Sequence, residues 1–149
     1  MTFDPQAFLN QAAGVKLDEQ RELVAEGEYL AIASEPKVEM KTSSKTGKPF
    51  YTFEIVWDIQ DQNELQRLGR DRATVRQQGF LDVKEDGSLD FGRQKNITLG
   101  QIFSALNMND GTGSLARITG QMARVKVTHR PDQNNPERTY AEVNRISKA

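Results

Sequence analysis

The sequence contains no cysteine and a single histidine, His129. Disulfides and thiolate metal sites are therefore excluded, and a zinc site or a histidine-assisted nucleophile would lack most of the side chains that it needs. No apolar run approaches the roughly 20 residues of a membrane span, and the opening MTFDPQAFLN lacks the pattern of a secretory signal. We therefore expect a cytosolic, non-enzymatic protein with no metal, no cofactor and no membrane partner.

The composition is that of one soluble globular domain, with 149 residues, 36% hydrophobic and 28% charged. The net charge of −1 conceals an asymmetry, because residues 1–35 carry −5 and residues 36–149 carry +4. A mildly basic body behind an acidic leader suits nucleic-acid binding, although many proteins that bind no nucleic acid have similar charges. We divide the chain into an acidic N-terminal helix and lead-in, residues 1–26, and a β-rich domain, residues 27–149.

The leader begins with a short predicted helix in FDPQAFLNQAAG. Asp4 can cap this helix, Pro5 suits its first position and Gly14 can end it. Phe3 and Phe8 occupy the positions of a hydrophobic staple. The acidic stretch VKLDEQRELVAEGE then leads into the β-rich domain and is expected to pack loosely on it.

Five strand regions follow in the rest of the chain. They are residues 28–41 with a bend or edge at Pro36, then 50–60, 72–83, 121–130 and 139–146. The clearest is FYTFEIVWDIQ, in which every second residue is apolar. Its predicted core row consists of Tyr51, Phe53, Ile55, Trp57 and Ile59.

A helix is predicted between the third and fourth of these strand regions. Thr98 and Gln101 have the spacing of a capping box, with Ile97 and Ile102 as its staple. An apolar stripe follows at helical spacing, made of Leu99, Ile102, Phe103 and Leu106. A helix at this place among five antiparallel strands is typical of the OB-fold, a small Greek-key barrel. We therefore predict a mainly β fold, a five-stranded OB-fold barrel with one capping helix between strands 3 and 4, plus the short N-terminal helix.

Two aromatic residues, Phe50 and Phe80, fall on the side of their strands opposite the core row. In TVRQQGFLD the inward row predicted is Val75, Gln77, Gly79 and Leu81, which directs Arg76 and Phe80 outward. An outward phenylalanine beside an arginine suits stacking on nucleic-acid bases. The alternative is that another loop or a partner subunit covers Phe80.

Basic residues gather in two connections, KTSSKTGKPFY at residues 41–51 and the loop PDQNNPE with its flanks. In an OB-fold the connections between strands 1 and 2 and between strands 4 and 5 flank the ligand groove. We therefore predict a nucleic-acid-binding surface rather than a merely solvated one. Its candidate residues are Lys41, Lys45, Lys48, Phe50, Tyr51, Arg72, Arg76, Phe80, Arg124, Lys126, Arg130 and Arg138.

The sequence also resembles a known family, the phage-encoded single-stranded-DNA-binding OB-fold proteins, formerly a domain of unknown function in tailed phages. The similar stretches include FLNQAAGVKL, EGEYLA, GKPF entering a strand, KN…LG opening the helix and G…ARVKVTHR in the fourth strand, over most of residues 5–147. The resemblance implies an OB-fold that coats single-stranded DNA in phage replication or recombination, in the cytoplasm of the infected bacterial host. Bacterial single-strand binders recruit partners through an acidic C-terminal tail, whereas this sequence ends NRISKA.

The leading hypothesis is thus a largely sequence-independent single-stranded-DNA-binding protein. The alternative is an OB-fold protein-interaction adaptor in a phage replication or recombination complex, with the acidic leader as its recognition element. Candidate partners beyond single-stranded DNA are a second copy of the chain and other phage replication or recombination proteins.

Overall fold

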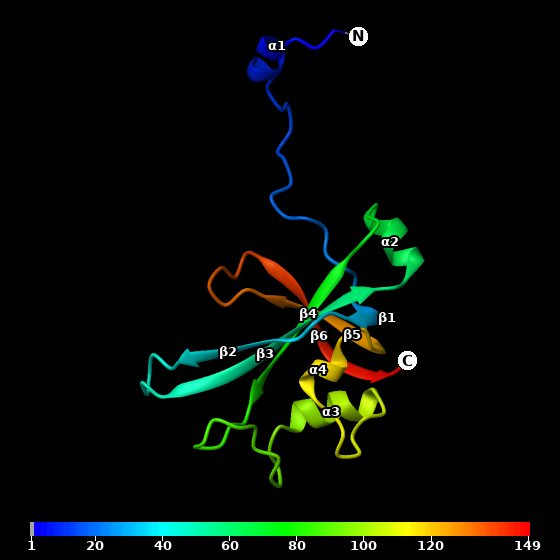
Figure 1. The fold of residues 1–149 in the computed structure, drawn as a ribbon. Coiled ribbons are helices and arrows are strands. Elements are labelled where there is room, and N and C mark those ends of the chain that lie inside the picture. Colours follow the sequence, from blue (N-terminus) through cyan, green and yellow to red (C-terminus); the bar gives the residue numbers. More distant parts are fainter. Residues whose placement is uncertain (1) are drawn as a thin grey trace.

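Six strands carry the fold in the computed structural model, which describes residues 2–149 (Figure 1). The strands are β1 (Gly27–Ala33), β2 (Lys37–Thr42), β3 (Pro49–Ile59), β4 (Thr74–Leu81), β5 (Met122–Pro131) and β6 (Thr139–Lys148). The helices are α1 (Pro5–Asn10), α2 (Gln62–Leu68), α3 (Ile97–Ala105) and α4 (Leu115–Ile118). The fold is therefore mainly β, as the sequence predicts.

The strands form one mixed sheet in the order β1-β5-β6-β4-β3-β2, and an additional pairing of β1 with β3 closes five of them into a ring. All neighbours are antiparallel except β4 and β6, which are parallel. The structure has six strands where the sequence predicts five, because the first predicted region is divided into β1 and β2 around Pro36. Proline has no N–H for the ladder, so β1 enters the ring and β2 pairs only with β3.

The core lies inside this ring, and the predicted alternation of β3 and β4 is confirmed. Phe53, Ile55 and Trp57 are at most 1% exposed, whereas the residues between them reach the surface. Gln77 also points inward, and its side-chain Oε1 accepts a hydrogen bond of 2.9 Å from Trp57 Nε1. The buried Trp57 indole N–H and the Gln77 side-chain oxygen thus satisfy each other.

Helix α3 lies between β4 and β5, where the sequence predicts a helix, and it packs against β6 and β4. Its buried residues include Leu99, Ile102 and Phe103, while Leu106 is half-buried. The predicted capping box at Thr98 and Gln101 is wrong, because the helix begins at Ile97. Ile97 itself is 54% exposed.

The residue before α3, Asn96, attaches the helix to the end of β4. Asn96 has φ 51° and makes no side-chain cap bond. Its buried side chain instead accepts from the Asp82 N–H at 2.9 Å and donates to the carbonyls of Asp82 and Asp90. The Asn96 N–H donates to Asp82 Oδ2 at 2.7 Å. The position of α3 is therefore set by a contact to the segment that follows β4, which a local cap pattern does not encode.

The N-terminal residues form an arm that extends away from the ring (Figure 1). Asp4 accepts from the Gln6 N–H at 3.0 Å, and Pro5 occupies the first turn of α1, as predicted. The rings of Phe3 and Phe8 lie 4.9 Å apart, which confirms the staple. The helix ends at Asn10, earlier than the predicted stop at Gly14.

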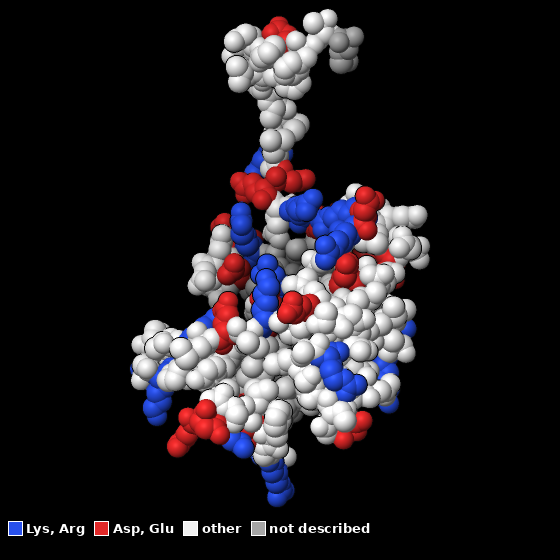
Figure 2. Space-filling view, in the orientation of Figure 1, with Lys and Arg blue, Asp and Glu red and all other residues white. Residues whose placement is uncertain are grey.

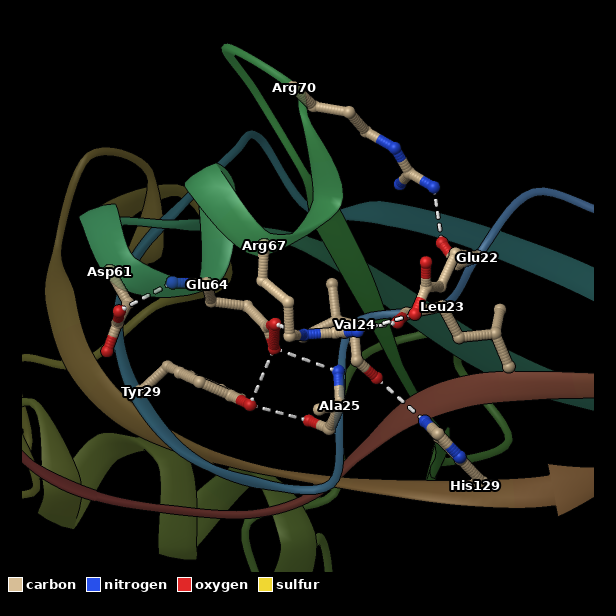
Figure 3. Close-up of polar contacts among 10 residues, drawn as sticks. All are labelled: Glu22, Leu23, Val24, Ala25, Tyr29, Asp61, Glu64, Arg67, Arg70 and His129. Carbon is tan, nitrogen blue, oxygen red and sulfur yellow. Dashed lines mark hydrogen bonds and ion pairs between the residues drawn. The ribbon is translucent and has the colours of Figure 1, made fainter.

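The base of the arm is fastened to α2 and β5 by a polar network (Figure 3). Glu64, only 4% exposed, accepts hydrogen bonds from Ala25 N–H at 3.0 Å, from Tyr29 Oη at 2.9 Å and from Arg67 Nε. His129 Nε2 lies 2.7 Å from the carbonyl oxygen of the neighbouring Val24. Residues 22–25, the end of the lead-in, are therefore fixed to the domain rather than loosely packed.

The same network shifts two pKa values. Burial, and then the hydrogen bond to Glu64, raise the pKa of Tyr29 to about 12. Burial alone would raise the pKa of Glu64, but the hydrogen bonds from Arg67, Ala25 and Tyr29 outweigh it and hold the pKa of this carboxyl below its ordinary value. The ionised form of Glu64 thus stabilises the folded protein.

The first prediction concerns Glu64→Gln. A glutamine has one acceptor oxygen where the carboxylate has two, so the free energy of unfolding at pH 7 should fall by about 1–3 kcal/mol. Because the folded pKa of Glu64 is lowered, its contribution is fully present above its unfolded pKa and disappears as pH falls through the folded pKa. Denaturant melts from pH 7 down to acid should therefore converge for the variant and the wild type.

The matched control is Glu22→Gln, since Glu22 also bonds Arg67 but its side chain is 65% exposed. We expect this control to change stability by less than about 0.5 kcal/mol at any pH. Equal losses in the two variants would show that the buried carboxylate is not the fastening point.

Candidate nucleic-acid interface

A groove of about 870 Å³ crosses the outer face of β3 and β4. Strand β2 and the β5–β6 hairpin form its two sides, and the start of α3 closes one end. Its lining includes Lys41, Phe50, Gln78, Phe80, Arg130 and Tyr140. A second hollow of about 820 Å³ between α3 and β6 shares Gln78, Arg130 and Glu142 with this groove. The two form one continuous depression over β4.

The register of the sheet places the two predicted stacking residues together. Phe80 on β4 lies opposite Thr52 on β3, two residues from Phe50, so both rings emerge on the same outer face. The ring centroids are 6.0 Å apart and the planes are inclined by 54°. Phe80 is 72% exposed and Phe50 is half-buried. The pair presents a large apolar surface in the middle of a polar groove, with one ring face open to a ligand.

Gly79 determines the depth of the groove beneath this pair. A Cβ atom at position 79 would lie 2.5 Å from Cε1 and 2.7 Å from Cζ of Phe53, whose ring is 1% exposed. Only glycine allows the β4 backbone to lie directly on this ring. The floor of the groove is therefore backbone resting on the core.

The second prediction is that Gly79→Ala destabilises the fold by about 1–3 kcal/mol, because Phe53 is enclosed and has no room to move aside. Thermal and denaturant unfolding would measure the loss. Gln78→Ala is the control, because the neighbouring Gln78 side chain is exposed, and it should leave stability within about 0.5 kcal/mol. A Gly79→Ala variant as stable as the wild type would contradict the close contact.

The charges in the groove are mixed, and two of its cations, Arg130 and Lys41, are paired with carboxylates. Lys37 also lines the groove and forms no ion pair within residues 2–149, whereas the predicted Arg76 is paired but lies outside the lining. Arg130 Nε lies 3.1 Å from Glu142 Oε1, Arg76 Nε lies 3.7 Å from Glu54 Oε1, and Lys41 Nζ lies 3.8 Å from an oxygen of Glu39. Figure 2 shows basic and acidic side chains interspersed on the face it presents. Exposed pairs of this kind contribute at most about 1 kcal/mol, and an arginine keeps further N–H groups for a phosphate.

Lys45 and Lys48 stand at the tip of the β2–β3 hairpin beyond the groove. Both are exposed, and neither forms an ion pair with any of residues 2–149. The turn is ordered by its own bonds, since the Ser43 N–H donates to the Lys48 carbonyl at 2.9 Å and the Gly47 N–H donates to the Ser43 carbonyl at 2.8 Å. Gly47 has φ 68°, a left-handed conformation that favours glycine.

Three other predicted residues lie apart from the aromatic pair. Tyr51 is half-buried and packs against the core, in the same row as Phe53. Arg72 precedes β4 and bonds Asp58 Oδ2 at 3.0 Å. Arg138 is exposed in the β5–β6 loop, where its N–H donates to the Asn135 carbonyl.

The structure does not bring Arg124 and Lys126 into the groove. They lie on β5 between β1 and β6, and β6 separates them from β4. Of the basic residues predicted on this strand, only Arg130 lines the groove, because it stands at the far end of β5 beside the hairpin loop.

Among the basic and outward aromatic residues of the groove, Lys37 and Tyr140 are absent from the candidates that the sequence predicts. Tyr140 could have been found from the alternation of TYAEVNRI, in which Ala141 and Val143 face the core and Tyr140 faces out. Lys37 carries no such signal, because its place opposite Glu54 depends on the register between β2 and β3.

No group of three or more His, Asp or Glu side chains within residues 2–149 is placed to hold a metal ion. In the same part of the chain, no helix has the length and apolar character needed to cross a membrane. Comparison with known proteins found no family model, no curated protein and no solved structure that matches the chain.

Proposed function

We propose that the protein has an OB-fold and binds single-stranded DNA largely without sequence preference, acting in phage DNA replication or recombination in the cytoplasm of the infected host. The order of the ring supports the fold. With β2 set apart, the ring strands in chain order are β1, β3, β4, β5 and β6, and α3 lies between the third and fourth. A five-stranded Greek-key barrel with a helix at this place is the OB-fold arrangement.

The observation that carries the proposal is the outward pair of Phe50 and Phe80. The pair stands on the second and third strands of the ring, between the β2–β3 and β5–β6 hairpins. OB-folds bind oligonucleotides on this face and with the corresponding two loops. An exposed aromatic pair in a groove bordered by basic side chains is the arrangement that single-stranded nucleic acid requires.

The roles follow from the geometry. A base stacks on the open face of Phe80, which any base can do because every base has a π-face. Arg130 and Lys41 are placed on the two sides of the aromatic pair to contact phosphates, exchanging part of their contact with Glu142 and Glu39 for the phosphate oxygens. Lys45 and Lys48 add contacts beyond the groove.

The third prediction is that Phe80→Ala weakens binding of labelled oligo-dT by about 5- to 150-fold, the loss of one stacked base. Its thermal stability should remain close to that of the wild type, because the Phe80 ring is largely exposed. Fluorescence anisotropy gives the affinity and calorimetry the melting temperature.

Phe91→Ala is the matched control for this experiment. Phe91 is 69% exposed, nearly as much as Phe80, but it lies outside the groove, in the segment between β4 and α3. We expect the affinity of this variant to be unchanged. Equal effects of the two substitutions would argue against stacking in the groove.

The fourth prediction concerns the hairpin tip. Each phosphate contact contributes about 0.7 to the slope of log affinity against log salt for single strands. Lys45→Ala combined with Lys48→Ala should therefore reduce the slope by about 1.4, equally for every base sequence. Lys84→Ala, an exposed residue outside the groove, should leave the slope unchanged. An unaltered slope in the double variant would indicate that the turn is a solvated connection that does not contact phosphates.

The exposed arm favours a second function, an adaptor that recruits proteins to a replication or recombination complex. Phe3, Phe8 and Leu9 are 67%, 65% and 77% exposed. Titration of the wild-type protein with oligo-dT at two salt concentrations separates the two functions. Absence of salt-dependent binding would leave the adaptor as the better account.

A further inference from the structure

Strand β2 has an outer edge that pairs with nothing in residues 2–149. It stands at the end of the sheet order and pairs only with β3 (Figure 1). All six of its residues are exposed, the stretch contains no proline, and it pairs with β3 without a shift of register. Proteins usually protect such edges with charged side chains, above all lysine, or with a proline, a bulge or a covering segment, because free N–H and C=O groups in a straight edge accept another strand. Here Lys37 and Lys41 provide such protection, so a strand that pairs with this edge must offset their charge.

The two faces of β2 differ in chemistry. Residues paired across an antiparallel ladder share a face. Val38 lies opposite Phe53 and Met40 lies opposite Tyr51, so both belong to the apolar face of the sheet. They are nevertheless 59% and 65% exposed, because β2 extends beyond the ring. The other face, which borders the groove, carries Lys37, Glu39 and Lys41.

We propose that the occupant of this edge is β2 of a second copy of the chain, paired antiparallel about a two-fold axis at Met40. In this register Met40 meets Met40 of the second copy, and Val38 meets Thr42. Glu39 of each copy lies opposite Lys41 of the other, so two opposite-charge pairs form on the groove face.

Other registers are less favourable. An axis at Glu39 places the two Glu39 side chains opposite each other and Lys37 opposite Lys41, which is repulsive. An axis at Val38 brings Pro36, which has no N–H, opposite Met40. A shift by one residue places the apolar face of one copy against the charged face of the other. The axis at Val38 would also give opposite-charge pairs, with Lys37 opposite Glu39. The axis at Met40 is favoured over it because it avoids Pro36 and pairs five residues of β2, 38–42, rather than three, 37–39.

This pairing gives a continuous sheet in the order β4-β3-β2-β2-β3-β4. A two-fold axis between antiparallel edge strands keeps both groove faces on the same side of the sheet. Each groove then gains, along its β2 wall, Lys37 and Lys41 of the second copy. This consequence for DNA rests on the proposed function, whereas the interface itself does not.

The experiment is a charge exchange followed by sedimentation equilibrium without DNA. The wild-type protein should be a dimer. Glu39→Lys sets a lysine opposite Lys41 of the second copy, and Lys41→Glu sets a glutamate opposite Glu39 of the second copy. Each variant alone should therefore dissociate about tenfold more readily. An equimolar mixture of the two variants should dimerise as well as the wild type, because both cross-pairs are then of opposite charge. Circular dichroism verifies that each variant is folded.

Two further variants test the place of the interface. Met40→Lys sets two lysines on the axis and should abolish the dimer, whereas Phe8→Asp on the exposed arm should leave it intact. The proposal is overturned by a wild-type protein that is monomeric up to about 1 mM. It is equally overturned if either charge reversal leaves the dimer unchanged, if the mixture does not restore it, or if Phe8→Asp abolishes it. Loss of oligo-dT binding would affect the proposed function and not this interface.

Discussion

The fold depends above all on the burial of one face of β3. Along this strand, Phe53, Ile55, Trp57 and Ile59 are buried without interruption. Each such side chain contributes about 1.5–3 kcal/mol by leaving water. A slip of one residue would expose the whole row, so the register of β3 against β1, β2 and β4 is fixed with high specificity. The same alternation leaves Phe50 no place but the outer face, and through the pairing of Thr52 with Phe80 it brings the second ring beside the first.

The groove and the arm are neighbours because of where the lead-in is fastened. Glu64 holds the chain at Ala25, and Gln20 Nε2 donates to the Thr139 carbonyl at the start of β6. Residues 21–24 line a hollow together with Tyr140, which also borders the groove. The acidic leader therefore departs from the end of the β5–β6 hairpin. An arm rooted there leaves Phe80 of the aromatic pair exposed.

Mixed charge in the groove has a consequence for affinity. Because Arg130 and Lys41 each have a carboxylate partner, a phosphate bound to them under the proposed function would replace an existing attraction. Under the proposed function, the net electrostatic gain at these two contacts would be smaller than in a uniformly basic cleft, and the aromatic surface would carry a larger share of the binding. Such a protein would bind single strands reversibly, with specificity for unpaired bases rather than for duplex backbone.

The sequence by itself determined the features that depend on residues close together in the chain. These are the inward rows of β3 and β4, the outward direction of Phe50 and Phe80, the existence of α3 and the capped start of α1. Each of these depends on neighbours within a few residues. Only the tertiary structure decided that Asn96, rather than Thr98, is the residue before the start of α3, because its partners Asp82 and Asp90 lie in the segment that follows β4. The place of Lys37 and the separation of Arg124 and Lys126 from the groove were likewise decided by strand order. Alternation tells which face a residue takes, but the position of that face around a closed ring depends on pairings between residues distant in the chain.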